Sequence, residues 1–142
     1  MRRYLYPVDL ETDEAGRVVA RVPDLAGCVT DGADAAEALR EAADALEESL
    51  AHSIAADEPA PPPSPARGRP CVAPGAIIAA KAALADAIRE AGISNTALAR
   101  DLDLGETEIR RMRDPRHATK IGRLEQALAV LGKRLVVAVD AA

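Results

Sequence analysis

The sequence predicts an α+β protein, in which a β-β-β-α domain precedes a helical domain that ends in one further strand. Apolar and polar residues alternate at residues 4–11 and again at 17–22, which is the period of half-buried strands. A proline-rich run at residues 59–70 excludes a helix or a central strand, because proline fixes φ and lacks a backbone donor. Beyond this run, apolar residues recur every three or four positions, as on one face of a helix. We therefore expect a domain at residues 1–58, a stiff extended linker at 59–74 and a second domain at 75–142.

The first domain is expected to begin with a β-hairpin, followed by a third short strand. The turn of the hairpin lies at residues 13–16, and Pro7 suits a strand at the edge of a sheet. Residues 28–30 form the third strand, before a turn at Asp31-Gly32. The pattern leaves open whether the segment Cys71-Val72 adds another strand. The alternating apolar residues of the hairpin are Tyr4, Tyr6, Val8 and Leu10, then Val18, Ala20 and Val22.

A helix that starts with the cap pair Asp34 and Glu37 is expected to follow these strands. Its apolar face holds Leu39, Ala43, Leu46, Leu50 and Ile54. Acidic residues recur at helical spacing on the opposite face, at Glu37, Glu41, Asp44 and Glu48. This strip predicts a surface that imitates phosphates and binds a cationic protein partner. The alternative is a helix face that its charges merely keep soluble.

Charge is distributed unevenly along the chain. Residues 1–58 carry five Arg against fourteen acidic side chains, a net charge of −9. Residues 59–142 carry thirteen Lys and Arg against nine acidic side chains, a net charge of +4. This asymmetry predicts two different partners, with nucleic acid as the natural partner of the basic half.

The second domain is expected to contain four helices and a terminal strand. The first helix ends at Gly92, Ser94 caps the second, and the third ends at Asp114-Pro115. Thr119 caps the fourth, and residues 134–139 form a strand that pairs with the same strand of a second copy. The apolar faces are Ile77, Leu84, Ile88 and Ala91 in the first helix and Ile121, Leu124, Leu128 and Leu131 in the fourth.

Residues 94–112 have the spacing of a helix-turn-helix. A small residue, Ala99, allows two short helices to cross closely, and the apolar residues Leu104 and Ile109 fix their angle. Two positions depart from the usual pattern: the turn residue is Asp103 instead of Gly, and the cap of the second helix is Gly105 instead of Ser or Thr. Both are physically allowed, since Asp tolerates the left-handed region and Gly is an acceptable cap.

The second of these two helices is a candidate for entry into the major groove of DNA. Arg110 and Arg111 can recognise bases there, while Arg and Lys beyond the helix suit phosphates. Packed helices with solvated Arg on their surface are the alternative, which Glu106 and Glu108 support because they repel phosphate. The candidate DNA-binding residues are Asn95, Glu106, Thr107, Glu108, Arg110, Arg111, Arg113, Arg116, His117 and Lys120.

The sequence offers no catalytic or metal-binding pattern. His52 and His117 fall in different predicted domains, and Asp9 lacks companions for a two-metal nuclease. Cys28 and Cys71 are too few for a disulfide scaffold. We therefore expect a protein that is not an enzyme and needs no cofactor or metal. The start of the chain lacks the apolar core of a signal peptide and no run suits a membrane span, so we expect a cytoplasmic location.

The order of these parts resembles the helix-turn-helix branch of the HicB antitoxin family. The resemblance covers nearly the whole chain. In the first domain, it rests on Tyr6-Pro-Val-Asp-Leu, Val22-Pro-Asp-Leu-Ala-Gly-Cys-Val-Thr-Asp-Gly32 and Ala36-Glu-Ala-Leu-Arg-Glu-Ala. In the second, it rests on Asp114-Pro-Arg-His-Ala-Thr119 and Leu131-Gly-Lys-Arg-Leu135.

The resemblance implies a partial RNase H-like fold in the first domain, without nuclease activity. It implies a HicA-type toxin that cleaves mRNA as the protein partner, and operator DNA of the shared operon as the second partner. A homodimer or higher oligomer through the terminal strand would carry two DNA-binding heads. Two alternatives stay open: a transcription regulator whose first domain senses a ligand or serves assembly, and an RNase H-like nuclease.

Overall fold

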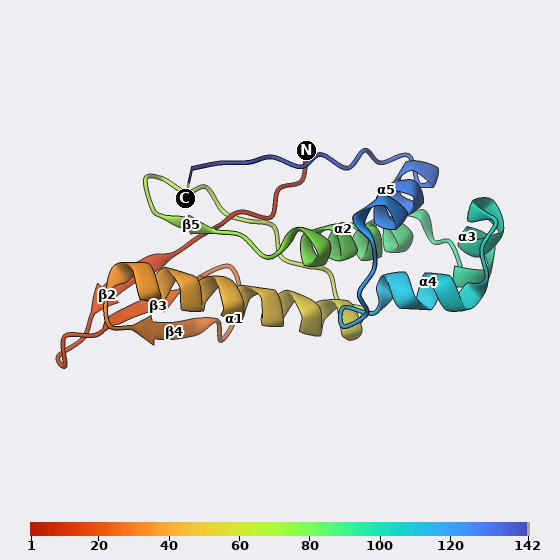
Figure 1. Cartoon of the computed structure of the whole chain (residues 1–142). Coiled ribbons are helices and arrows are strands. Elements are labelled where there is room, and N and C mark those ends of the chain that lie inside the picture. Colours follow the sequence, from red (N-terminus) through yellow and green to blue (C-terminus); the bar gives the residue numbers. More distant parts are fainter. Residues whose placement is uncertain (142) are drawn as a thin grey trace. The chain divides into compact units, whose positions relative to one another are not determined.

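The computed structural model describes residues 1–141, which fold into two compact units (Figure 1). Unit 1 consists of Met1–His52 and Ala60–Gly75. Unit 2 consists of Ser53–Pro59 and the chain from Ala76 onward. Each unit is therefore built from two separate stretches of sequence. The mixed helix and strand content agrees with the predicted α+β class.

The strands of unit 1 form two small antiparallel sheets. One sheet has the order β2 (Asp9–Thr12), β3 (Val18–Arg21) and β4 (Val29–Gly32). In the other sheet, β1 (Tyr6–Pro7) pairs with β5 (Cys71–Val72). The segment Cys71-Val72, left open by the sequence, thus forms a strand.

Two predictions about these strands are wrong in detail. The expected first strand is interrupted at Val8, whose amide N donates to the carbonyl O of Pro70 at 2.9 Å, so its two parts pair with different strands. Asp31-Gly32 belongs to β4 instead of a turn, because both residues pair with β3. These differences depend on partners distant in sequence, which a local pattern does not specify.

The long helix α1 (Ala35–Ala55) starts at the predicted cap pair. The Asp34 carboxylate accepts from the amide N of Glu37 at 2.8 Å, and the Glu37 carboxylate accepts from the amide N of Ala33 at 2.8 Å. Leu39 and Ala43 are only half-buried, contrary to prediction. The buried stripe consists of Ala38, Ala42, Leu46, Leu50 and Ile54.

Hydrogen bonds with two residues of the HicB-like motifs, Tyr6 and Asp24, hold the proline-rich run against the rest of unit 1. The hydroxyl of the fully buried Tyr6 donates to the carbonyl O of Pro61 at 2.7 Å. One carboxylate oxygen of Asp24 accepts from both the amide N and the hydroxyl of Ser64, at 2.9 and 3.1 Å. Tyr6 and Asp24 therefore hold the proline-rich run in place.

The replacement Gly32→Ala is expected to destabilise the protein by about 1 to 3 kcal/mol, as overpacking does. A Cβ at Gly32 would overlap the backbone N of Ala38 in the first turn of α1, and backbone atoms cannot yield as a flexible side chain can. Denaturant unfolding followed by circular dichroism measures the change. Gly122→Ala is the control, because its Cβ would meet open space and Ala favours a helix more than Gly does. Equal stability of Gly32→Ala and the unchanged protein would contradict the close packing of β4 on α1.

Unit 2 is a cluster of helices around α2 (Ala76–Ala91), with α3 (Asn95–Leu102), α4 (Glu106–Arg113) and α5 (Ile121–Val130). Leu84 and Ile88 of the predicted α2 face are buried, whereas Ile77 is half-buried and Ala91 is exposed. The core consists of Ala80, Leu84, Ala87, Ile88, Leu98, Ala99, Ile109, Met112, Leu124, Ala127 and Leu128. None of the helices in the described residues is both long and apolar enough for a membrane span.

The predicted cap and the predicted apolar face of α5 need correction. Lys120, not Thr119, is the N-cap residue of α5, because the Thr119 hydroxyl instead lies 3.4 Å from the carbonyl O of Arg111. Ile121 is 36% exposed, unlike the buried Leu124 and Leu128. Within the described chain, residues 134–139 pair with no strand. Their pairing with the same segment of a second copy stays a prediction.

Candidate functional site

Helices α3 and α4 are joined by a three-residue turn whose geometry follows from the sequence. The Ser94 hydroxyl caps α3 by accepting from the amide N of Ala97 at 3.1 Å, as predicted. Asp103 adopts the left-handed region with φ 55° and ψ 45°. The amide N of Leu104 then donates to the carbonyl O of Ala99 at 2.9 Å, and Gly105 is the N-cap of α4. The substitutes expected to be tolerated at 103 and 105 therefore take the predicted backbone roles.

The two helices are held by apolar residues, which determines the exposed face of α4. Leu98 and Ala99 of α3 and Ile109 and Met112 of α4 are buried in the core of unit 2. This burial leaves the opposite side of α4 at the surface, where Glu106, Thr107, Arg110 and Arg111 are exposed.

Arg110 and Arg111 each pair with an acidic residue of their own helix. The guanidinium of Arg110 lies 2.9 Å from the carboxylate of Glu106, and that of Arg111 lies 2.9 Å from the carboxylate of Glu108. Exposed pairs at this spacing contribute only about 0.3 to 0.5 kcal/mol. A ligand that offers two acceptors can therefore replace the carboxylates at small cost.

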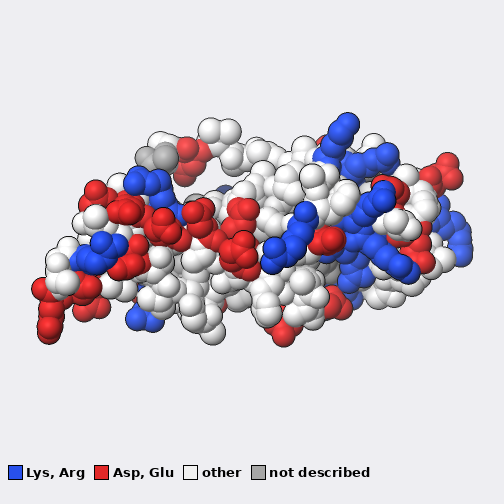
Figure 2. Space-filling view, turned by 60° about the horizontal axis from the view of Figure 1, so that its bottom comes forward, with Lys and Arg blue, Asp and Glu red and all other residues white. Residues whose placement is uncertain are grey.

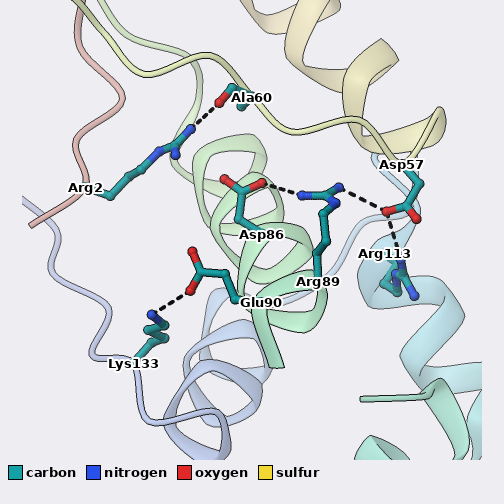
Figure 3. A network of polar contacts seen from close by, with 8 residues as sticks. All are labelled: Arg2, Asp57, Ala60, Asp86, Arg89, Glu90, Arg113 and Lys133. Carbon is teal, nitrogen blue, oxygen red and sulfur yellow. Dashed lines mark hydrogen bonds and ion pairs between the residues drawn. The ribbon is translucent and has the colours of Figure 1, made fainter. Parts of the chain in front are cut away.

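Arg113 and Asn95 are brought together, although the sequence separates them. The Arg113 guanidinium donates to the Asn95 side-chain oxygen at 2.8 Å. It also donates to the Asp57 carboxylate at 3.3 Å (Figure 3). The same Asp57 oxygen accepts from Arg89 at 3.1 Å, and Arg89 also pairs with Asp86 at 2.8 Å. Arg113 is thus half-buried and bound within unit 2, unlike the exposed Arg110 and Arg111.

The loop after α4 carries further candidate residues. Arg116, His117 and Lys120 are all exposed. Within the described residues, Arg116 and Lys120 form no ion pair, so their charges are available to an anion. The loop is ordered by its own polar groups: the Asp114 carboxylate accepts from the amide N of Arg116 at 2.9 Å, and a ring nitrogen of His117 lies 3.2 Å from the Thr119 hydroxyl.

Lys81 is the residue of this region that the sequence analysis missed. Its side chain is fully buried in α2, and its ammonium donates to the carbonyl oxygens of Arg111, Asp114 and His117 at 3.3, 2.5 and 2.6 Å. Burial lowers the pKa of Lys81, and the nearby Asp114 carboxylate opposes that shift. Its place in the helical repeat, between Ile77 and Leu84 on the predicted apolar face, was the signal for a buried cation.

The acidic strip of α1 is shorter than predicted. Glu41, Asp44 and Glu48 are exposed, whereas Glu37 is half-buried and occupied by the helix cap. Figure 2 shows a face of unit 1 on which acidic side chains gather. The exposed strip therefore consists of three carboxylates.

The charge of the two units differs from that of the two halves of the sequence. Arg67 and Arg69 belong to unit 1, while Asp57 and Glu58 belong to unit 2. Unit 1 has seven Lys and Arg against twelve acidic residues, a net charge of −5, and unit 2 has eleven of each. The positive charge of unit 2 is local, because residues 110–123 carry six Lys and Arg against one Asp. Basic side chains also gather on the face of unit 2 seen in Figure 2.

Several similar proteins match nearly the whole chain, although no protein-family model matches it. The chain is 38% identical over 130 residues to Antitoxin HicB 2 of Photorhabdus laumondii subsp. laumondii. The aligned region covers 92% of each of the two chains. It is 31% identical over 131 residues to Antitoxin HicB of Escherichia coli, and the aligned region covers 92% of this chain and 95% of the relative. It is 29% identical over 135 residues to Antitoxin HicB 1 of the same Photorhabdus, at 95% and 86% coverage. Each match includes parts of both units.

Proposed function

Because the chain belongs to the HicB family of antitoxins, we propose that it neutralises a HicA-type mRNA-cleaving toxin through unit 1 and represses its own operon through unit 2. The observation that carries this proposal is the separation of exposed charge. Three exposed carboxylates lie on α1 of unit 1, while the basic side chains of residues 110–123 lie on and after α4 of unit 2. In this proposal the chain has no catalytic activity of its own, and it acts in the cytoplasm, where mRNA and the operon are found.

The toxin-binding role rests on charge complementarity. An enzyme that cleaves mRNA must present a cationic surface to the phosphates of its substrate. Glu41, Asp44 and Glu48 present carboxylates in a row on a rigid helix, held by the buried stripe on its opposite side. Such a row occupies the RNA-binding surface of the toxin in place of RNA. Neutralisation then needs no chemistry, only exclusion of the substrate.

The DNA-binding role rests on α3 and α4, which we interpret as a helix-turn-helix. The exposed side of α4 presents Thr107, Arg110 and Arg111 to the major groove, where an Arg fork suits the two acceptors of guanine. Arg116 and Lys120 follow directly after α4 and suit phosphates at the edge of the groove. Asn95 and Arg113 act mainly through the contact between them, because Arg113 is already bound within unit 2.

Removal of the two α4 guanidiniums tests the DNA-binding role. Each of Arg110→Ala and Arg111→Ala is expected to cost about 1 to 3 kcal/mol of operator binding and to relax the sequence preference. Fluorescence anisotropy with a duplex from upstream of the gene, compared with a scrambled duplex, measures both effects.

Arg40→Ala is the matched control, because Arg40 is an exposed residue on α1 in unit 1. The control is expected to bind both duplexes like the unchanged protein. Unchanged affinity and unchanged preference in the folded double variant of Arg110 and Arg111 would reject α4 as the recognition helix.

A further inference from the structure

Lys81 is the only charged side chain among the described residues that is fully buried. A buried ammonium is costly unless its donors are satisfied. The ammonium of Lys81 has three donors, and three backbone carbonyl oxygens converge on it, from Arg111, Asp114 and His117. The three carbonyl oxygens therefore satisfy all three donors of the buried ammonium.

The three carbonyls belong to the segment that carries the candidate DNA contacts. Arg111 lies in the last turn of α4, Asp114 is its C-cap, and His117 lies in the following loop. The carbonyl oxygens of Arg111 and Asp114 each also accept one backbone amide, from Asp114 and His117, both at 3.2 Å. Carbonyls at the end of a helix carry partial negative charge. Lys81 adds a charged donor common to all three carbonyls and offsets a negative potential that opposes the approach of phosphate.

We propose that Lys81 is a positioning residue for DNA binding, which joins the end of α4 to residues 114–119 in one fixed arrangement. This inference rests on the proposed DNA-binding function of unit 2. Lys81 itself has no exposed surface and touches no DNA. It acts through Arg111 and Arg116, whose backbones it and Asp114 hold in register. The recognition helix and the phosphate-binding loop then reach the duplex together.

The side-chain chemistry at position 81 is specific. Only an ammonium presents three donors from a single atom on a stem that fits among apolar side chains. In Lys81→Met the stem is retained, but the three carbonyls lose their common donor. In Lys81→Gln two donors remain, so the tie to the loop is weakened instead of removed.

The test compares full-length Lys81→Met with the unchanged protein on the duplex from upstream of the gene. Below the melting temperature of both proteins, the variant is expected to bind about tenfold more weakly, which corresponds to the loss of one good contact. The slope of log affinity against log salt is expected to fall by about one, because Arg116 no longer reaches its phosphate. In an Arg116→Ala background, Lys81→Met should have a smaller effect, since the two residues act on the same contact.

A purely structural role for Lys81 predicts a different result. The melting temperature would then fall, while the folded variant kept the affinity and the salt slope of the unchanged protein. That outcome, or full additivity with Arg116→Ala, overturns the proposal. Glu125→Gln, an exposed change on α5, is the control that should alter none of these quantities.

If Lys81→Met fails to fold, Lys81→Gln takes its place. Its amide hydrogen exchange over residues 114–120 is expected to be faster than in the unchanged protein, with an intermediate loss of affinity. Equal exchange and equal affinity would contradict the proposal. If the unchanged protein itself binds no DNA from its operon, the proposed function fails together with this inference. If the unchanged protein binds its operator and the Lys81 variants bind it equally well, the inference fails but the proposed function stands.

Discussion

A chain with Val137→Lys and Val139→Lys is expected to be a monomer in sedimentation and to bind its operator about 100-fold more weakly than the unchanged protein, because avidity is lost. Val137 is 64% exposed and Val139 is 98% exposed, whereas Leu135 packs against the core of unit 2. We propose that these exposed residues lie between two copies, as paired antiparallel strands about a two-fold axis. Such pairing satisfies backbone groups that a lone strand leaves open.

The effect is large because one recognition helix contacts only a few base pairs. Two heads held by symmetry bind half-sites about 34 Å apart, so the second contact becomes intramolecular. The double substitution leaves Leu135 in place, and so it leaves the packing of unit 2 intact, which a truncation after Gly132 would not do.

Ala138→Lys is the matched control for this prediction. It adds the same kind of charge in the same segment, but in a strand its side chain points to the opposite face from Val137 and Val139. The control is expected to remain dimeric. A double variant that stays dimeric would contradict the terminal segment as the interface, and equal loss of the dimer in both variants would contradict its pairing as a strand.

Charge reversal on α1 is expected to abolish protection against the toxin. Glu41→Lys and Glu48→Lys together replace two carboxylates of the exposed strip by ammonium groups. Like charges that face each other in an interface cost several kcal/mol, so affinity for the toxin should fall by about 100-fold or more. Titration calorimetry with the purified toxin measures this loss.

Glu11→Lys and Glu14→Lys form the matched control, because they give the same change in net charge at exposed positions near the β2–β3 hairpin. This control is expected to keep most of the affinity. If it loses as much affinity as the α1 variant, net charge alone governs the complex. If it loses more, the toxin docks at the sheet, and the role given to α1 is wrong.

The local features of the fold were predictable from the sequence because they depend on neighbouring residues. Ser94, Asp103 and Gly92 take the backbone roles that capping chemistry assigns to them. The cap pair Asp34 and Glu37 was equally local. The starts of α1 and α3 and the end of α2 could thus be placed from a few residues each.

The features that the sequence did not predict depend on contacts between distant residues. The expected first strand divides at Val8 because residue 70 and β5 lie beside it. Thr119 is not the N-cap of α5, because its hydroxyl lies near the carbonyl O of Arg111. Such choices are made by tertiary partners, and periodicity carries no information about them.

The candidate site shows the same division. The exposed positions of Arg110 and Arg111 follow from the burial of Ile109 and Met112, which their spacing predicted. The binding of Arg113 by Asp57, in contrast, joins residues 56 positions apart. Lys81 was overlooked because a lysine in the apolar face of a helix looks like a break in the hydrophobic pattern. Its role is evident only from the three carbonyls that it binds.

The most direct test of the antitoxin assignment is the rate of mRNA cleavage by the purified toxin from the same operon, measured with and without this chain. The account predicts that stoichiometric amounts of the chain suppress cleavage, and that the α1 charge-reversal variant does not. Cleavage that continues at an unchanged rate in the presence of excess folded chain would contradict it.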